Sequence, residues 1–456
     1  MGRERRPSDR VRVPPPLIRR RVRSGRGATE QPNAVGDGDA PLTARFWLLV
    51  LLTGAAAGLF GDVLMLVLFS VEHLAFGFHR GNFEQAVLHA DALRRVASLL
   101  VAGAVGGLLW YLLRRVTPGE RTDADDTVWT GASLSPRGSL ASGLISEFVI
   151  GMGASLGREA APRLMGAVSG SVLATRFSLS EGQRRLLVAC GAGAGLAAVY
   201  NVPLGGALFT AEVMLGSLAL PTVLPALACS AVATGVAWLY LPDHATYLGI
   251  PDVRAGAAIS VFAVVAGPLI GVAATGIIRL FGFVSHHRAR GRLVLVAPLV
   301  AFGVLGLIGI AYPQLFGNGR DLAEDVLFGQ HEGFAFLVAM LALKPLVTAL
   351  CIESGASGGV LTPTFATGAV LGSLLGSVWS LAWPGTPSTA YALVGAAAML
   401  GAAMQAPLAA LAIVLELTHA GFGLMVPMAL ATAVATFVSR QLDGYSIYSA
   451  RLPASA

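Results

Sequence analysis

Charged residues are scarce in this sequence. Asp, Glu, Lys and Arg make up 13% of its 456 residues, whereas hydrophobic residues make up 55%. Soluble domains usually carry about 25% charged residues, so the composition excludes an ordinary soluble protein. The mean hydropathy of +0.69 agrees with that exclusion. We therefore predict a polytopic membrane protein.

Cysteine is also scarce, and motifs for metal binding or covalent catalysis are missing. Cys190, Cys229 and Cys351 lie in apolar runs without paired or metal-type spacing, as is typical of small buried hydrophobic residues. The hydrophobic segments contain no His/Asp/Glu metal cluster and no Ser/His or Cys/His pair recognisable by motif. We expect no metal site and no cofactor, which argues against an intramembrane enzyme.

Large apolar residues are few in residues 1–43, where ten arginines and the proline run Pro14–Pro16 dominate. This composition predicts a disordered arm. The arm lacks an apolar core followed by a cleavage site, so it is not expected to be a signal peptide. A basic flank before the first span places the N-terminus in the cytoplasm by the positive-inside rule, which we favour over a role in binding nucleic acid.

Apolar segments recur along the rest of the chain, from residue 44 onward. They fall at about 46–72, 94–113, 139–156, 158–175, 185–200, 203–216, 220–241, 257–284, 293–312, 333–352, 361–382, 390–402, 407–417 and 422–439. A helix needs about 20 residues to cross a bilayer, and several of these segments are shorter. We therefore predict an all-α membrane protein with many tilted and half-spanning helices, whose inner ends are buried in protein or line a wet cavity.

The stretch Gly153–Ser171 places two adjacent charged residues, Arg158 and Glu159, in apolar surroundings. Ionisable groups at membrane depth are costly and usually mark a pathway or binding site. Glycines precede Arg158, and a helix is predicted to start near Glu159 with Pro162 in its first turn. Because a helix start presents free N–H groups and a positive dipole end, it is suited to binding an anion.

The same pattern returns 202 residues later at Gly355–Ser373. A second repeated motif follows each copy. It consists of Pro-Leu, seven further residues and a glutamate, which is Glu212 in the first copy and Glu416 in the second. We predict an internal duplication with inverted halves at about 46–240 and 255–452. The helix starts near Glu159 and Leu361 should then face one cavity. Glu212 and Glu416 are interpreted as structural residues that cap or bridge helices.

Four ordered motifs resemble those of the ClC chloride channels and chloride/proton antiporters, over about residues 46–452. They are Gly157-Arg158-Glu159, GGVLTP at 358–363, the two Pro-Leu…Glu helices and SIYSARL at 446–452. The resemblance implies a homodimer of inverted halves, of the kind without C-terminal CBS domains, with one anion pore in each subunit. It implies that Glu159 gates the pore and that Tyr448 contacts the central ion, with Tyr445 three residues earlier as the alternative tyrosine. It also implies that the anion meets backbone amides of Arg158, Glu159, Ala160, Val360 and Leu361, which supply partial positive charge without trapping the ion.

Three departures from the family pattern qualify this interpretation. The loop expected to read Gly-Ser-Gly-Ile-Pro lies near 121–126, where Thr122, Asp123 and Ala124 provide no serine. Ala-Ala-Pro follows Glu159 where Gly-Pro is expected. Val213 occupies the position at which family antiporters carry an inner proton-relaying glutamate, and valine cannot carry a proton.

The function predicted from the sequence is therefore transport of chloride or a similar small anion through a pore gated by a glutamate, and a passive channel is favoured. An anion/proton antiporter of the same family is the alternative, with protons as second substrate and a selectivity that need not be for chloride. An intramembrane enzyme or an unrelated secondary transporter is the alternative from another class. We expect a multi-pass protein of the cell's inner or plasma membrane, dimerised through helices near 203–235 and 407–435. Small residues at Gly205, Gly206, Ala409 and Ala410 suggest close helix approach there.

Overall fold

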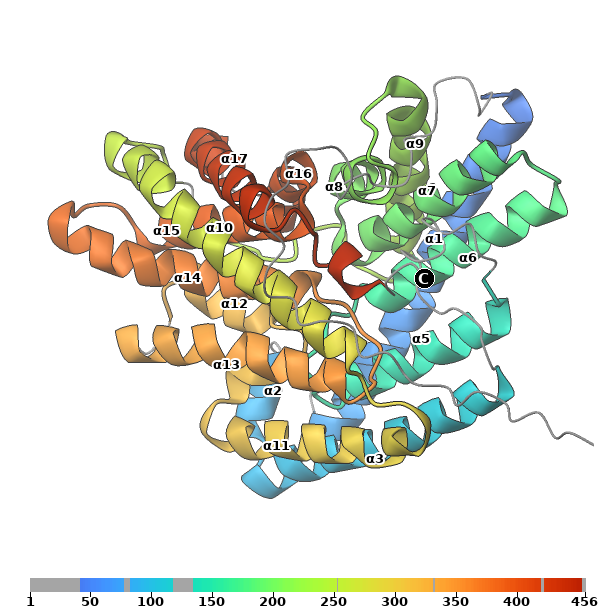
Figure 1. Ribbon diagram of the computed structural model, residues 1–456, viewed down its shortest axis with the longest axis horizontal. Helices are drawn as coiled ribbons and strands as arrows, with labels where there is room; N and C mark the ends of the chain where they lie inside the picture. Colours follow the sequence, from blue (N-terminus) through green and yellow to red (C-terminus); the bar gives the residue numbers. More distant parts are fainter. Residues whose placement is uncertain are drawn as a thin grey trace, which may run out of the picture. The chain divides into compact units, whose positions relative to one another are not determined.

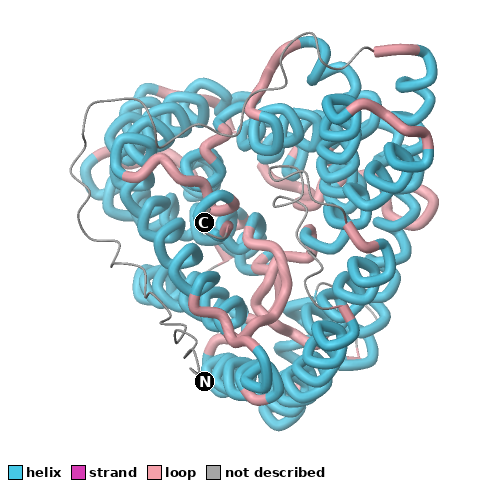
Figure 2. The backbone as a smooth tube through the Cα atoms, turned by 45° about the vertical axis from the view of Figure 1, so that its right-hand side comes forward, coloured by secondary structure: helices cyan, strands magenta, loops and turns pink. Residues whose placement is uncertain are grey.

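The chain forms helices joined by loops in the computed structural model (Figure 1), which describes residues 42–77, 83–117, 134–251, 253–330, 333–419 and 422–452. The candidate loop residues Thr122, Asp123 and Ala124 lie outside these ranges. The expected arm at 1–43 also lies outside them, except for residues 42 and 43. Within them the only β-type pairing is an isolated bridge (Figure 2), and the fold is all-α as predicted. All described residues belong to one unit, residues 31–456.

Helices of the first half follow the apolar segments closely. They are α1 (Ala44–Phe76), α2 (Phe83–His89), α3 (Ala92–Val116), α5 (Pro136–Gly151), α6 (Ala160–Arg176), α7 (Glu181–Tyr200), α8 (Pro203–Phe209), the π-helix η1 (Thr210–Leu215) and α9 (Leu220–Ala237). Four of them, α1, α3, α5 and α7, begin after a residue whose side chain accepts a hydrogen bond from a first-turn N–H. Ser135 caps α5, and Ser180 with Gln183 forms a capping box at α7.

Helices of the second half repeat this plan. They are α10 (Ala257–His286), η2 (Gly291–Leu295), α11 (Ala297–Ala311), η3 (Pro313–Leu315), α12 (Arg320–Leu327), α13 (Phe334–Glu353), α14 (Leu361–Ala382), α15 (Ser388–Met404), α16 (Pro407–Thr418), η4 (Phe422–Leu424), α17 (Met425–Leu442) and η5 (Ser449–Arg451). Among the described residues, eight helical segments are long and apolar enough to cross a membrane. Three shorter apolar helices, residues 203–215, 388–404 and 407–418, match the predicted half-spanning type.

The sequence repeat is also a repeat of backbone conformation. Gly153 and Gly355, which are 202 residues apart, have φ values of 109° and 93°, in a region that favours glycine. Asn201 and Gln405 both have φ of 56° and end α7 and α15 just before the Pro-Leu helices. Left-handed residues at matching places give both halves the same sharp turns.

Glycines bring the paired helices α6/α7 and α14/α15 into close contact. A side chain at Gly166 would overlap the carbonyl of Gly191, and one at Gly368 would touch Met399 and the carbonyl of Gly395. Gly166 and Gly368 are equivalent in the two copies. Close backbone approach through small residues is the usual means of packing helices at membrane depth, and it is the same in both halves.

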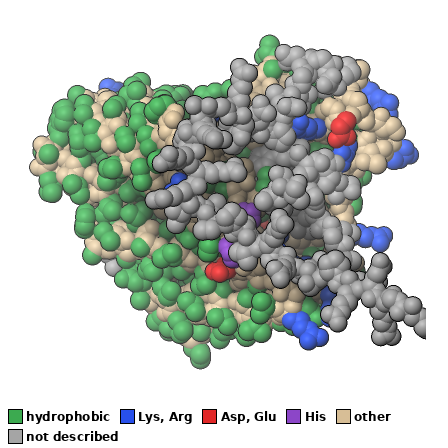
Figure 3. Space-filling model, in the orientation of Figure 1, with side chains coloured by type: hydrophobic (Ala, Val, Ile, Leu, Met, Phe, Trp, Pro, Cys, Tyr) green, Lys and Arg blue, Asp and Glu red, His purple; other side chains and the backbone are tan. Residues whose placement is uncertain are grey.

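The small residues proposed to form a subunit contact pack against other helices of the same chain instead. Ala409 and Ala410 have no exposed surface, and a side chain at Gly205 would meet Ile413 and Glu416 of α16. Gly206 packs against Gly193 and Ala197 of α7. The prediction that these four residues face a second subunit is therefore wrong, because the Pro-Leu helices of the two halves need them to pack on each other. Large apolar side chains cover the outside of helices such as α10, α11 and α13 (Figure 3).

Two short α-helices and one change of helix type were not predicted from the sequence. The short helices α2 and α12 are too polar to register as apolar segments, and they contact each other where the Glu84 N–H donates to the Asp321 carboxylate at 3.1 Å. The π-helix η1 continues α8 without a break. No pattern in its sequence, TAEVML, distinguishes it from an ordinary helix.

Candidate functional site

The two glycine-rich stretches meet at the centre of the described structure. Gly157 and Gly359 form an antiparallel bridge in which each N–H donates to the other's carbonyl at 2.7 Å. The bridge brings the start of α6, just after Glu159, next to the start of α14 at Leu361. The two helix starts therefore lie close together, and the cavity that they are expected to face stays a prediction.

The Glu159 carboxylate lies in the gap between the helix starts. Its Oε1 accepts a hydrogen bond of 2.8 Å from the Leu361 N–H, the first amide of α14, and its Oε2 accepts one of 3.1 Å from the Tyr200 hydroxyl. The side chain has no exposed surface. A negative group therefore occupies the N-terminus of α14, where backbone donors and the helix dipole favour an anion.

Two glycines make room for this carboxylate. A side chain at Gly157 or at Gly359 would overlap the Glu159 carboxylate oxygens. The residues that bridge the two halves are therefore also those that admit the acid to the α14 N-terminus. Any larger residue at either position would push the carboxylate out.

Tyr200 and Thr362 extend the hydrogen-bond network, and the sequence analysis missed both. The Tyr200 hydroxyl lies 2.5 Å from the Thr362 hydroxyl and donates to Glu159, so Thr362 is the donor in the bond between the two hydroxyls. Tyr200 ends α7, directly before the Asn201 turn. Its position immediately ahead of the first Pro-Leu motif is the feature of the sequence from which Tyr200 could be identified.

Arg158 reaches the other side of Tyr200. Its guanidinium lies 5.1 Å from the centre of the Tyr200 ring and 5.8 Å from that of Phe69. It also lines a cavity of about 130 Å³ together with the polar side chains of Glu72, Asn318, Arg320 and Asp321. Burial raises the pKa of Asp321 to about 6, against the opposing effect of Arg320. Side chains of both charges thus lie beside Arg158.

Glu147 of α5 is a further acid near this position. It has no exposed surface, and its carboxyl oxygens have no hydrogen-bond partner within the described structure. It lies on one face of α5 between Gly143, which packs on Ala161 of α6, and Gly151, which packs on Val71 of α1. The charged groups that act on it are Arg158, Glu159 and Glu72.

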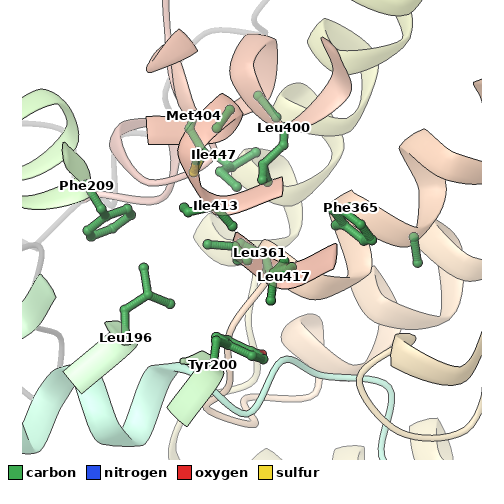
Figure 4. Close-up of a cluster of buried hydrophobic side chains, with 14 of the residues drawn as sticks. Leu196, Tyr200, Phe209, Leu361, Phe365, Leu400, Met404, Ile413, Leu417 and Ile447 are labelled. Atoms are coloured by element: carbon green, nitrogen blue, oxygen red, sulfur yellow. The ribbon is translucent and has the colours of Figure 1, made fainter. Parts of the chain in front are cut away.

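A second cluster lies one helical turn further along α6. The Arg163 guanidinium lies 4.5 Å from the ring centre of Phe209 and 4.8 Å from that of Tyr448. These two rings meet edge to face with centres 5.5 Å apart. Figure 4 shows Phe209 among buried side chains that include Tyr200 and Leu361. Tyr448 is thus in contact with α6 and α8, as a residue of the central region should be, whereas Tyr445 is 47% exposed.

The remaining predicted site residues are placed as follows. Ala160 is the first residue of α6, and Val360 is the fully buried N-cap residue of α14. Val213 is 3% exposed and lies in the π-helix. Thr122, Asp123 and Ala124 lie outside the described residues. In the described part of the chain, no group of three His, Cys, Asp or Glu side chains could hold a metal ion.

Glu212 and Glu416 cap each other's helices. Glu416 accepts from the N–H groups of Leu204 and Gly205 at 2.9 and 2.6 Å, and Glu212 accepts from those of Leu408 and Ala409 at 3.3 and 2.7 Å. Each acid belongs to one half and satisfies the first turn of the Pro-Leu helix of the other. This reciprocal capping agrees with the structural role predicted for both.

Comparison with known proteins adds independent evidence. A family model described as "Voltage gated chloride channel" matches residues 102–440. The chain belongs to the voltage-gated chloride channel family. Curated members similar to it include the voltage-gated ClC-type chloride channel ClcB of Escherichia coli O9:H4, which is 30% identical over 409 residues, covering 88% of this chain and 95% of that protein. ClcB of Salmonella typhi is 31% identical over 379 residues, covering 81% of this chain and 89% of that protein.

Solved structures of this ClC family share the fold. A slow cyanobacterial Cl⁻/H⁺ antiporter aligns with a TM-score of 0.78 and 21% identity, covering 90% of this chain and 97% of that one. A CLC-type fluoride/proton antiporter aligns with a TM-score of 0.72 and 21% identity, covering 89% and 97% of the two chains. The chain is accordingly a multi-pass membrane protein of the ClC family, whose members are transporters and channels rather than enzymes.

Proposed function

We propose that the chain conducts chloride or similar small anions across the membrane, along a path that passes between the starts of α6 and α14. The observation that carries this proposal is the Glu159 carboxylate at 2.8 Å from the Leu361 N–H. An acid bound where an anion would bind is a competitor for that place, so Glu159 acts as the gate and the conformation described is the closed one. Opening requires the carboxylate to leave.

A passive channel remains the favoured mechanism. Val213 supports it, because a buried valine in η1 offers no proton site at the inner position. The relatives named as channels are consistent with the same mechanism. We further propose that the protein is a homodimer with one pore in each subunit, and that it lies in the cell's inner or plasma membrane with its N-terminus in the cytoplasm.

One observation favours anion/proton antiport as the second candidate. Glu147 is a fully buried carboxyl that has no hydrogen-bond partner among the described residues, and Glu159 is one of the charged groups acting on it. Because an unpaired carboxyl at such a place is most stable as the neutral acid, Glu147 could hold a proton near the gate. This path would not need an acid at position 213.

The deciding experiment is flux by the purified protein in liposomes. Chloride, nitrate, bromide and fluoride are supplied in turn under an imposed pH gradient, and anion and proton movement are recorded together. We expect anion flux that is faster in acid, and uphill proton uptake driven by an anion gradient that is weak or absent. Robust coupled proton uptake would establish the antiporter instead, and an absence of flux for all four anions would refute the proposed transport function.

A further inference from the structure

The carboxylate of the proposed gate is enclosed by protein, so a proton from solution needs a route to it. Glu159 has no exposed surface, and it is not among the described residues that line the cavity beside Arg158. Arg158 does line that cavity, and its positive charge repels a hydrated proton. Protons from the cavity therefore need acceptor groups that carry them to Glu159.

Glu72 is an acceptor at the cavity itself. It lies near the end of α1, and its partly exposed side chain lines the cavity together with that of Leu68, one turn earlier. The charged groups that act on it are Arg158, Asp321 and Arg320. A carboxylate in this position is able to take a proton from solution in the cavity.

Glu147 lies on the face of α5 that connects the cavity with the gate. One turn before Glu147 this face packs on Ala161, two residues after the gate, and one turn after it on Val71, which adjoins Glu72. Ile150, three residues after Glu147, is itself part of the cavity wall. Glu147 is therefore placed between the acid that lines the cavity and the start of α6.

Glu147 is suited to storing a proton. Its side chain has no exposed surface, and neither carboxyl oxygen has a hydrogen-bond partner in the described part of the chain. Such a group is most stable as the neutral acid. The charged groups that act on it are Glu72 from α1, and Arg158 and Glu159 from the residues before α6. The positive charge of Arg158 stabilises the carboxylate that forms for a short time when the proton leaves.

We propose that Glu72 and Glu147 form a relay that carries protons from the cavity to the Glu159 carboxylate. The inference rests on the proposed gate and adds the route by which acid opens it. Glu147 gives its proton to Glu159, which becomes a neutral acid and releases the Leu361 amide. Glu147 then takes a proton from Glu72, and Glu72 takes one from solution. One proton leaves the solution for each one that reaches Glu159, so both relay residues return to their first state. Chains of carboxyl groups are a known means of moving protons at membrane depth.

The test follows the rate at which anion flux rises after rapid acidification of liposomes that contain the full chain. Glu147→Gln keeps the size of the side chain and removes the acid, so opening should be at least about tenfold slower, as expected when a positioned acid is lost. Glu72→Gln should slow opening as well. Glu147→Asp keeps a carboxyl and should restore most of the rate. A merely structural defect would lower the final flux without delaying its rise.

Asp62→Asn is the matched control. Asp62 lies on α1 like Glu72 and is only 8% exposed, but it is not among the described residues that line the cavity. Its variant should open at the rate of wild type. A wild-type rate in either Glu147→Gln or Glu72→Gln would overturn the relay, and so would equal slowing by Asp62→Asn. If Glu147→Gln fails to fold, Glu72→Gln decides alone.

Infrared spectroscopy of the purified protein tests the stored proton without any flux. A protonated carboxyl absorbs apart from an ionised one, so wild type at neutral pH should show a band that Glu147→Gln lacks. Identical spectra would overturn the proposal. Wild-type protein that has this band but moves no anion would refute only transport. Acid-opened flux that depends on Glu159, with normal opening rates in the Glu72 and Glu147 variants, would refute only the relay.

Discussion

Glu159 is held in place by one amide and one hydroxyl, and both bonds depend on its carboxylate. A charged acceptor makes each hydrogen bond worth about 1.5–3 kcal/mol. Loss of the charge by protonation weakens both bonds and removes the attraction of the α14 dipole. The direction of the pH effect follows, because acid neutralises the blocking group and should open the pathway.

The first prediction concerns the charge on this residue. Glu159→Gln and Glu159→Ala should each raise anion flux by at least about tenfold, equivalent to about 1.4 kcal/mol of gate stabilisation. Flux should also lose its dependence on pH, because the titrating blocker is gone. Liposome flux between about pH 5 and 8 checks both effects. Flux and pH profile matching wild type in both variants would exclude a gating role.

The second prediction concerns Tyr200. Tyr200→Phe keeps the ring beside Arg158 and removes only the hydroxyl that bonds Glu159 at 3.1 Å. The closed gate should lose about 1.5 kcal/mol, so flux at neutral pH should rise by about tenfold. Tyr391→Phe is the control, because Tyr391 is also buried but bonds Ser380, in α14. A rise in flux of the same size in both variants would contradict the specific role of Tyr200.

Sequence could locate the proposed gate, Glu159, but not its partners. Glu159, Arg158 and the two glycine-rich stretches were visible because each is a costly residue or an unusual repeat. Tyr200 and Thr362 looked like ordinary residues at helix ends, and their roles depend on contacts between segments 162 residues apart. Arg163 carried a usable signal, since it is a charged residue one turn after the gate in an apolar segment. The rings that receive it come from two other elements and could not be inferred.

At the scale of elements, the two Pro-Leu helices cap each other reciprocally. Each begins with N–H groups that have no acceptor in their own helix, and each receives a carboxylate from the other half. The exchange couples α8 and η1 to α16, so loss of either acid should loosen both halves.

The third prediction follows from this exchange. Glu212→Ala and Glu416→Ala should each lower the free energy of unfolding by about 1–2 kcal/mol, the usual cost of losing an N-cap. The two losses should be similar, because each acid accepts two backbone N–H groups. Melting of the purified protein in detergent checks this. Glu181→Ala is the control, since its side chain is 71% exposed and its pairing with Arg184 at the surface contributes little. If all three substitutions lowered the melting temperature equally, Glu212 and Glu416 would contribute no more to stability than an exposed surface glutamate.

Element boundaries were well predicted where hydrophobicity alone sets them. The segment expected at 361–382 coincides with α14, and the one expected at 257–284 differs from α10 by two residues at its end. The short helices α2 and α12 could not be predicted in this way, because their sequences form no apolar run and their positions depend on packing against other elements, α1 for α2 and α14 and α15 for α12. The prediction of the residues that form the subunit contact was wrong for a related reason. A sequence shows that small residues allow close approach, but it does not say whether the approaching helix belongs to the same chain.

At the scale of the whole molecule, the dimer remains a prediction, and the exposed surface suggests a different set of residues for it. Leu204 of α8 and Leu408 of α16 are 47% and 45% exposed and occupy equivalent positions in the two halves. They lie beside the capped helix starts, within the segments where the contact was expected.

The fourth prediction tests that surface. The purified protein should have twice the chain mass of 46.9 kDa when measured in detergent. Replacing Leu204 and Leu408 together by Trp should shift it toward monomer, because bulky side chains prevent close packing of the two subunits. Leu307→Trp on α11, where Leu307 is 62% exposed, should leave the mass unchanged. Wild-type protein with the mass of a single chain would contradict the predicted dimer.

The bridge between Gly157 and Gly359 has a consequence for how the protein folds during its synthesis. The first half leaves the ribosome with the Gly157 N–H and carbonyl unpaired, and with Glu159 unable to find the Leu361 amide until 202 further residues have been translated. The Glu416 acid that caps α8 arrives later still. The site therefore cannot assemble during synthesis of its own first half, and a nascent chain stopped near residue 250 should be a substrate for membrane quality control rather than a functional half.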